Sequence, residues 1–203
     1  KNFPQSAESI KALGSNYLYY LKYEYAQQVY EIGRQILNAP DEFHLEMASV
    51  FMMQRNYPMM LEEYLNLLVF QPRYLRTAES QIRSAMTRDV DETLLEMARS
   101  KCLEYIQRFP GLDVFNELLI WIYLQEENYD KAIDLSFALD RRNKEDGGRI
   151  LELARQAYEA RVFSAAIKAY KIILDKGTAP AVKDVKSKIL PKETPYILAK
   201  REI

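Results

Sequence analysis

Residues 128–135 read NYDKAIDL, and residues 162–169, thirty-four positions further on, read VFSAAIKA. Both stretches place an aromatic residue three positions before an alanine that isoleucine follows. Tyr23 and Tyr57, in the N-terminal half, are also thirty-four residues apart. A fixed period of this size is typical of repeat proteins, in which each repeat packs on its neighbours. The spacing therefore predicts a repeat architecture.

The same period extends over most of the chain. Three residues after the aromatic stand Ala26, Met60, Ala132 and Ala166. Seven residues after it stand Tyr30, Tyr64, Ser136 and Tyr170, and six residues before it stand Tyr17, Phe51, Tyr123 and Ala157. The period divides the chain into the repeats 7–40, 41–74, 75–112, 113–146 and 147–180. The third repeat is four residues longer. Its second half fits this register, and its first half fits only if the extra residues lie near 87–92.

Each repeat reads as two helices. In the first repeat, Ile10, Gly14 and Tyr17 share one helical face, a break follows near residues 21–22, and Tyr23 and Ala26 begin a second face. Prolines 40, 72, 110 and 180 stand near repeat ends, where a helix must stop. Small residues such as glycine and alanine allow two helices to approach closely, and the neighbouring aromatic residue then fills the remaining space.

The segment LGSNY at residues 13–17, followed by Tyr23, Ala26 and Tyr30, resembles the tetratricopeptide repeat. The resemblance covers residues 7–180 and implies an all-α fold, a right-handed superhelical solenoid of helix-turn-helix repeats. The sequence departs from the family pattern at two positions. The tryptophan position holds Ile10, His44, Asn116 and Ile150, and the glycine position holds Ile120 in the fourth repeat. A related helix-pair repeat, such as a Sel1-like unit, stays an alternative.

Composition excludes several classes of protein. The chain of 203 residues has a net charge of −1, which indicates no attraction to nucleic acid or to anionic membranes. No apolar run is long enough to cross a bilayer, so membrane insertion is not expected. Fifteen tyrosines are present, but most fall on core positions of the repeat and lack the basic residues that base stacking on nucleic acid needs.

Nothing in the sequence indicates catalysis, a cofactor or a metal. His44 is the single histidine and occupies a core position of the repeat, and Cys102 occupies the position of Tyr30 and Tyr64, which predicts an inert buried thiol. The pair Gly147 and Gly148 belongs to a polar turn with no phosphate-binding pattern around it.

The resemblance implies that the first helix of each repeat lines a concave groove. Carried onto this sequence, the groove positions include Lys11, Ser15, Tyr19, Leu45, Glu46, Ser49, Met53, Arg83, Trp121, Gln125, Glu152, Arg155, Tyr158 and Glu159. In the four regular repeats, the charged groove residues are six glutamates against Lys11 and Arg155. Trp121 either faces the groove as an anchor or packs between repeats.

These features favour a non-enzymatic scaffold that binds a peptide segment of a protein partner, with apolar side chains and a basic one. The alternative is a structural spacer in a longer multidomain protein, with the groove filled by the protein's own chain. An enzyme of unrecognised type is a third and weaker alternative.

The repeat pattern fails after Pro180. Residues 181–190 are expected to form a helix that caps the last repeat, and residues 191–195 a short linker. Residues 196–203 are apolar enough to begin a further element, or to dock on this domain or on a neighbouring copy. The start at Lys1 rather than methionine fits both a bacterial cell-envelope protein with its leader removed and a cytoplasmic protein, so the sequence leaves the compartment open.

Overall fold

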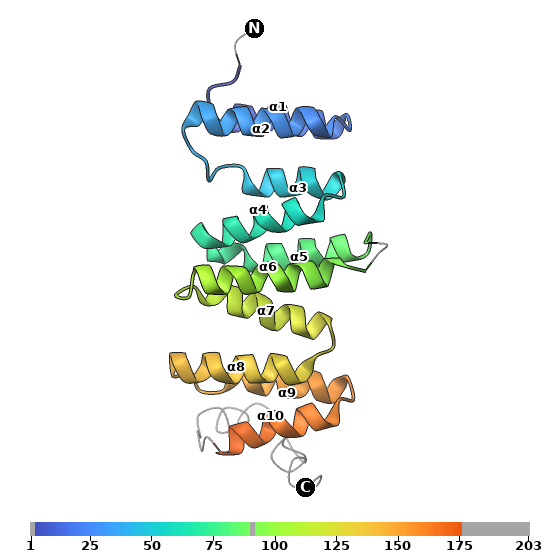
Figure 1. Ribbon diagram of the computed structural model, residues 1–203, viewed down its shortest axis with the longest axis vertical. Helices are drawn as coiled ribbons and strands as arrows, with labels where there is room; N and C mark the ends of the chain where they lie inside the picture. Colours follow the sequence, from blue (N-terminus) through green and yellow to red (C-terminus); the bar gives the residue numbers. More distant parts are fainter. Residues whose placement is uncertain (1–2, 90–91, 176–203) are drawn as a thin grey trace, which may run out of the picture. The chain divides into compact units, whose positions relative to one another are not determined.

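The computed structural model describes residues 3–89 and 92–175, and the expectations for residues 181–203 lie outside them. Within the described residues, the fold is all-α: ten α-helices, one short 3-10 helix and no strand (Figure 1). The helices are α1 (Ala7–Tyr19), α2 (Tyr23–Leu37), α3 (His44–Met53), α4 (Tyr57–Phe70), η1 (Pro72–Tyr74), α5 (Leu75–Met86), α6 (Leu94–Arg108), α7 (Asp113–Gln125), α8 (Tyr129–Asn143), α9 (Gly148–Glu159) and α10 (Phe163–Asp175). Each expected repeat therefore contains one pair of helices.

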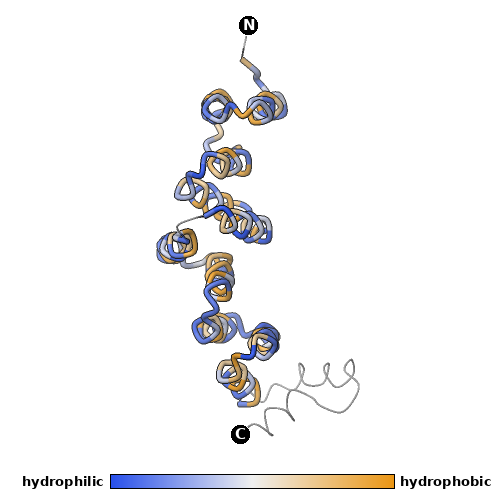
Figure 2. The backbone as a smooth tube through the Cα atoms, turned by 90° about the vertical axis from the view of Figure 1, so that its right-hand side faces the viewer, coloured by the Kyte–Doolittle hydropathy of each residue, from blue (hydrophilic) through white to orange (hydrophobic). Residues whose placement is uncertain are grey.

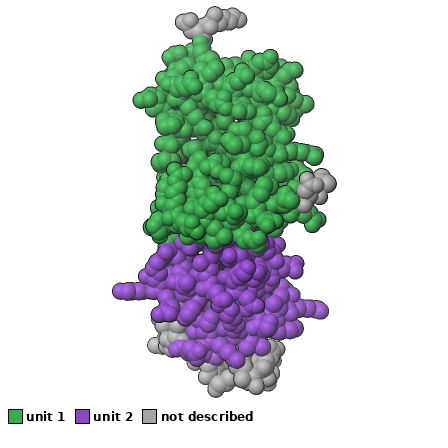
Figure 3. All heavy atoms as spheres, in the orientation of Figure 1, with its two compact units in different colours: residues 1–115 green, residues 116–203 purple. Residues whose placement is uncertain are grey.

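The chain divides into two compact units, Lys1–Phe115 and Asn116–Ile203 (Figure 3). The boundary falls within α7. In the first unit, α1 packs on α2 and α3, and α4 packs on α3, α5 and α6. In the second unit, α9 packs on α8 and α10. This packing of each helix on its neighbours in the chain is that of an α-helical solenoid, as the sequence predicted.

Several helices combine a hydrophobic and a hydrophilic side (Figure 2), whereas most residues of α3 and α4 are buried. The position three residues after the aromatic residue, which Leu95 replaces in the third repeat, is buried in every repeat. It holds Ala26, Met60, Ala98, Ala132 and Ala166. The core of the second unit joins Ile120 of α7 to buried residues of α8, α9 and α10.

Close helix approach depends on two glycines of the first unit. A methyl group on Gly14 of α1 would overlap the ring of Tyr30 on α2. A methyl group on Gly33 of α2 would lie 2.7 Å from Cγ2 of Ile10 and 2.9 Å from Cε2 of Phe43. Both distances are shorter than a van der Waals contact, so these sites require glycine for the packing seen. This confirms the role that the sequence assigned to Gly14.

The turn inside four of the five helix pairs has one repeated geometry. One residue of each turn adopts a left-handed backbone: Leu21, Arg55, Glu127 and Arg161, with φ between 55° and 62°. The next backbone N–H donates to a carbonyl five residues earlier, and all four of these hydrogen bonds measure 2.8 Å. The pattern is a Schellman motif, which closes the C-terminus of a helix. In two turns the following residue, Asn56 or Asn128, also caps the next helix through its side chain.

The third pair differs. Residues 87–93 connect α5 to α6, whereas the other four pairs are connected by three residues each. The connection in the third pair is therefore four residues longer than in the others. In the second repeat, α3 begins at His44, after Phe43 turns the chain with a left-handed φ of 63°.

Candidate partner-binding surface

The predicted groove positions of the first two repeats lie on α1 and α3, which pack on each other. Lys11 Nζ and Glu46 Oε1 form an ion pair of 3.1 Å that joins the two helices. Partial burial opposes the charge of Lys11, but the hydrogen bond and charge of Glu46 outweigh this effect and raise the pKa of Lys11. A ligand carboxylate would therefore have to compete with Glu46 for this lysine.

The other predicted residues of this surface differ in exposure. Ser15, Tyr19 and Met53 are exposed, with Tyr19 at 79% and Met53 at 43%. Leu45 and Ser49 are half-buried, and the Ser49 hydroxyl donates a hydrogen bond of 2.9 Å to the Leu45 carbonyl of its own helix. Tyr19 and Met53 end α1 and α3, so the largest apolar side chains of this surface lie at the ends of the two helices. Arg83, the prediction for the third repeat, is exposed on α5.

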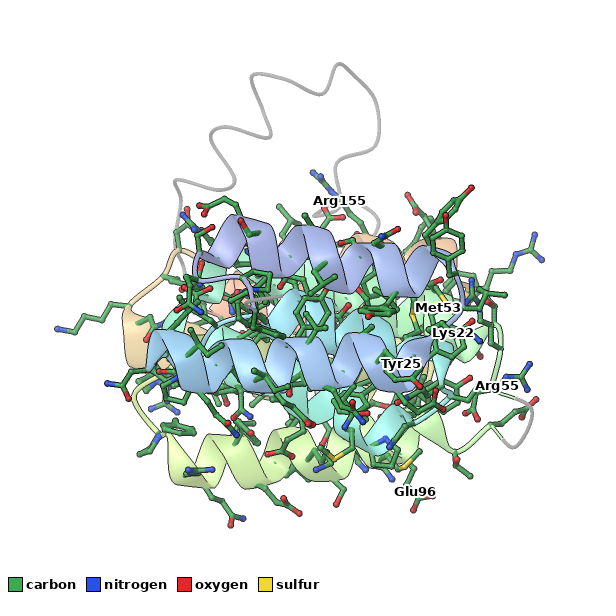
Figure 4. All side chains as sticks on the ribbon, turned by 90° about the horizontal axis from the view of Figure 1, so that it is seen from above. Lys22, Tyr25, Met53, Arg55, Glu96 and Arg155 are labelled. Carbon is green, nitrogen blue, oxygen red and sulfur yellow. The ribbon has the colours of Figure 1, made fainter. Side chains whose placement is uncertain are left out.

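The predicted residues of the second unit lie on α7 and α9. On α9, Glu152, Tyr158 and Glu159 are exposed and Arg155 is half-buried. Arg155 points outward in Figure 4, and its Nη1 lies 3.9 Å from Oε2 of Glu152, which is a weak ion pair at an exposed site. The Tyr158 ring packs edge-on against Phe163, with the ring centres 5.7 Å apart. These α9 side chains stay predictions for partner binding.

Gln125 and Trp121 of α7 offer less free surface. Gln125 is half-buried, and Trp121 is only 7% exposed. Of the two alternatives for Trp121, this burial favours packing between helices over a groove anchor.

A buried polar cluster joins α2, α3 and α4. Glu63 Oε2 lies 2.6 Å from Nδ1 of His44 and 2.7 Å from Nη2 of Arg34. Burial opposes the ionisation of Glu63, but these two partners outweigh it and lower its pKa. The Arg34 Nε also donates to the carbonyl of Glu42 at 2.7 Å. The sequence identified His44 as a core residue but did not reveal Arg34 or Glu63 as its partners.

The single cysteine is enclosed. Burial raises the pKa of Cys102 to about 12, and its thiol donates to the Phe115 carbonyl at 3.1 Å. A thiol with so high a pKa is a poor nucleophile, which confirms the expectation of a buried, inert cysteine.

Among the described residues, no three His, Cys, Asp or Glu side chains are grouped closely enough to hold a metal ion. In the same residues, no helix has the length and apolarity that a membrane span requires.

Three tyrosines near one turn lie outside the core: Tyr19, which the sequence assigned to the groove, and Tyr20 and Tyr25, which it did not, are 79%, 63% and 55% exposed. They surround the turn between α1 and α2, where the helical register alone does not assign a buried side.

No protein-family model matches the chain, and no curated protein matches it. Among solved structures, the chain is similar to PilF of Pseudomonas aeruginosa, from a study of its functional characterization. The two are 22% identical, and the match covers 83% of this chain and 75% of that one with a TM-score of 0.39. A similarity of this size carries no argument about function, and the fold described above rests on the helices themselves.

Proposed function

We propose that the chain is a non-enzymatic scaffold of tetratricopeptide-like repeats that binds a peptide segment of a protein partner on its first-helix surfaces. The observation that carries the proposal is the exposure of Ser15, Tyr19 and Met53 on α1 and α3. Paired helices that leave one surface free are a common way of presenting a long binding face to a peptide.

The charge of these surfaces favours a basic segment. Lys11 is already paired with Glu46, and Arg155 lies beside Glu152. Glu8 on α1 and Glu159 on α9 are exposed and form no ion pair within the described part of the chain. The charge left for a ligand is therefore acidic, and a lysine or arginine beside apolar side chains complements it.

Affinity capture followed by mass spectrometry, with the intact chain as bait, identifies candidate partners, and calorimetry then measures their affinity. We expect Ser15→Arg, which places a bulky charge on α1, to weaken binding with the fold intact. The matched control is Ser100→Arg, the same change at an exposed position of α6, a second helix of its pair. Tyr158→Ala should weaken binding by more than about 1 kcal/mol if this tyrosine is an anchor.

A partner whose affinity is unchanged by both Ser15→Arg and Tyr158→Ala would contradict the proposal. The spacer function, with the groove occupied by the protein's own chain, would then be the better explanation.

A further inference from the structure

An unusual group of exposed apolar side chains lies in the turn of the first helix pair and on the helices that follow the first two turns. Tyr20 and Leu21, in the turn between α1 and α2, are 63% and 69% exposed. Tyr25 on α2 is 55% exposed, and Met59 on α4 is 42% exposed. We call these four residues, with the neighbouring Lys22 and Arg55, the edge surface. Figure 4 shows Lys22, Tyr25 and Arg55 at the same end of the helices.

The repeat fold does not require this apolar character. At the position equivalent to Tyr20, the fourth repeat has Glu126 and the fifth has Ala160. At the position equivalent to Leu21, they have Glu127 and Arg161. All four turns have the same left-handed residue and the same closing hydrogen bond. Because the second unit builds this turn with polar or small residues, the apolar side chains of the first unit serve some purpose other than folding.

The tyrosine rings of this region are held in place by other rings. Tyr25 stacks on Tyr17 with the ring centres 5.5 Å apart and the planes at 30°. Tyr20 meets Tyr19 edge-on, at 5.1 Å and 83°. Rings that are already ordered lose little conformational entropy when a partner binds, and tyrosine is enriched at protein interfaces for its large, amphipathic contact area.

The charges of the edge surface indicate what kind of partner fits. Lys22 and Arg55 are exposed, and neither side chain forms an ion pair or hydrogen bond with the described residues. By contrast, Lys168 in the second unit is paired with Asp130 and Asp134. Glu24 is the one acidic residue within three positions of Lys22 or Arg55. Two unpaired cations beside apolar side chains complement a carboxylate that is flanked by apolar groups.

We propose that the edge surface is a second docking site, which takes a protein segment that presents apolar side chains next to aspartate or glutamate. This site adjoins the first-helix surface, because Tyr20 contacts Tyr19. Its charge preference is opposite, however, so it does not rest on the function proposed above. A membrane surface is a poorer match, because recruitment to anionic lipid uses clusters of about four to eight basic residues.

The test uses two short synthetic peptides and the intact chain. One peptide carries Phe and Leu beside Glu, and its twin has Lys in place of every Glu. We expect the Glu peptide to bind about tenfold more tightly at low salt, and the preference to shrink as salt rises. The double variant Lys22→Glu with Arg55→Glu should abolish or reverse the preference. The control, Lys131→Glu with Arg161→Glu, makes the same change of charge in the second unit and should leave it unchanged.

The apolar contribution is tested with Leu21→Asn combined with Tyr25→Ser. Asparagine tolerates the left-handed backbone of residue 21, so the turn is kept while the apolar side chains are lost. We expect affinity for the Glu peptide to fall at least about fivefold, as it does when an interface anchor is truncated. Circular dichroism and the melting temperature establish that the variant is folded. Ser15→Arg should leave binding of this peptide unchanged, which separates this proposal from the first-helix surfaces.

Three outcomes would overturn the inference. The first is equal affinity for the two peptides. The second is a preference that the edge variants do not alter. The third is cosedimentation of the chain with phosphatidylglycerol vesicles, lost in the Lys22→Glu and Arg55→Glu variant, in the absence of binding to either peptide, because the edge surface would then be a lipid contact.

Discussion

We expect residues 14 and 30 to share one space in the core, so that a larger side chain at one is tolerated only with a smaller side chain at the other. In α1 and α2, Gly14 leaves room for the ring of Tyr30. The second and fifth repeats combine alanine with tyrosine at these two positions. In the fourth repeat the relation is reversed, because Ile120 and Ser136 occupy them and both are buried. Large and small residues thus compensate each other across the helix crossing.

The perturbation is to copy the fourth-repeat pair into the first repeat. Gly14→Ile alone places a branched side chain where a single methyl group already overlaps Tyr30, and we expect a loss of about 3 kcal/mol in the free energy of unfolding. Tyr30→Ser alone removes a fully buried ring and should cost about 3–5 kcal/mol. The double variant should be more stable than the sum of the single changes predicts, by about 2–3 kcal/mol. Gly14→Ala should also destabilise the fold, because its methyl group overlaps the ring of Tyr30, but by less than Gly14→Ile, because alanine is smaller and gains helix propensity.

The assay is a double-mutant cycle of urea unfolding, followed by circular dichroism. If Gly14→Ile alone does not fold, recovery of a folded protein in the double variant is the expected sign of compensation. Losses that add to within about 0.5 kcal/mol would refute the reasoning, because the two positions would then not share one space.

Three further predictions concern the core and the turns. The pKa of Glu63 is lowered, so its contribution to stability is fully present above the ordinary value of 4.5 and is lost as the pH falls through the lower folded-state pKa. Glu63→Gln should therefore flatten the loss of stability below about pH 4.5, measured by the urea midpoint. At neutral pH the same change should cost about 3–5 kcal/mol, since it leaves Arg34 without its buried counter-ion; an unchanged midpoint would show that the cluster is not coupled to folding. Cys102, with a pKa of about 12, should react with a disulfide reagent at pH 8 only after denaturation, and rapid reaction of the folded chain would contradict its burial. Asn128→Ala removes the side-chain cap of α8 and should lower stability by about 1 kcal/mol, while the melting temperature of Gln28→Ala, an exposed change on α2, should stay the same.

The helix pairs follow directly from the sequence because their signal is periodic. Ala26 and Ala132 recur at one repeat position, and helical spacing places that position on the buried side. The additional residues of the third repeat are also visible in the sequence, because residues 87–93 interrupt a register that resumes at Ala98. Local spacing of this kind depends on geometry within one helix, which the sequence encodes directly.

Contacts between helices were not predictable in the same way. Arg34 and Glu63 are twenty-nine residues apart on α2 and α4, and no motif links them. Whether Trp121 faces outward depends on how α7 is rotated in its packing, which a repeat register specifies only approximately. The exposure of Tyr20 and Tyr25 was not predicted for a related reason. The sequence around an aromatic residue beside a turn does not indicate whether its side chain is buried or exposed.

The four left-handed turns have a consequence for how such a chain changes over evolutionary time. Leu21, Arg55, Glu127 and Arg161 share one backbone conformation although their side chains differ in size, charge and polarity. The conformation is therefore maintained by the backbone hydrogen bonds on either side, and all four side chains are exposed to solvent. A single substitution at such a position alters the chemistry of one helix-pair tip while leaving the closing bonds in place. New binding preferences at these tips can thus arise by small mutational steps, independently in each repeat, without a search for a new fold.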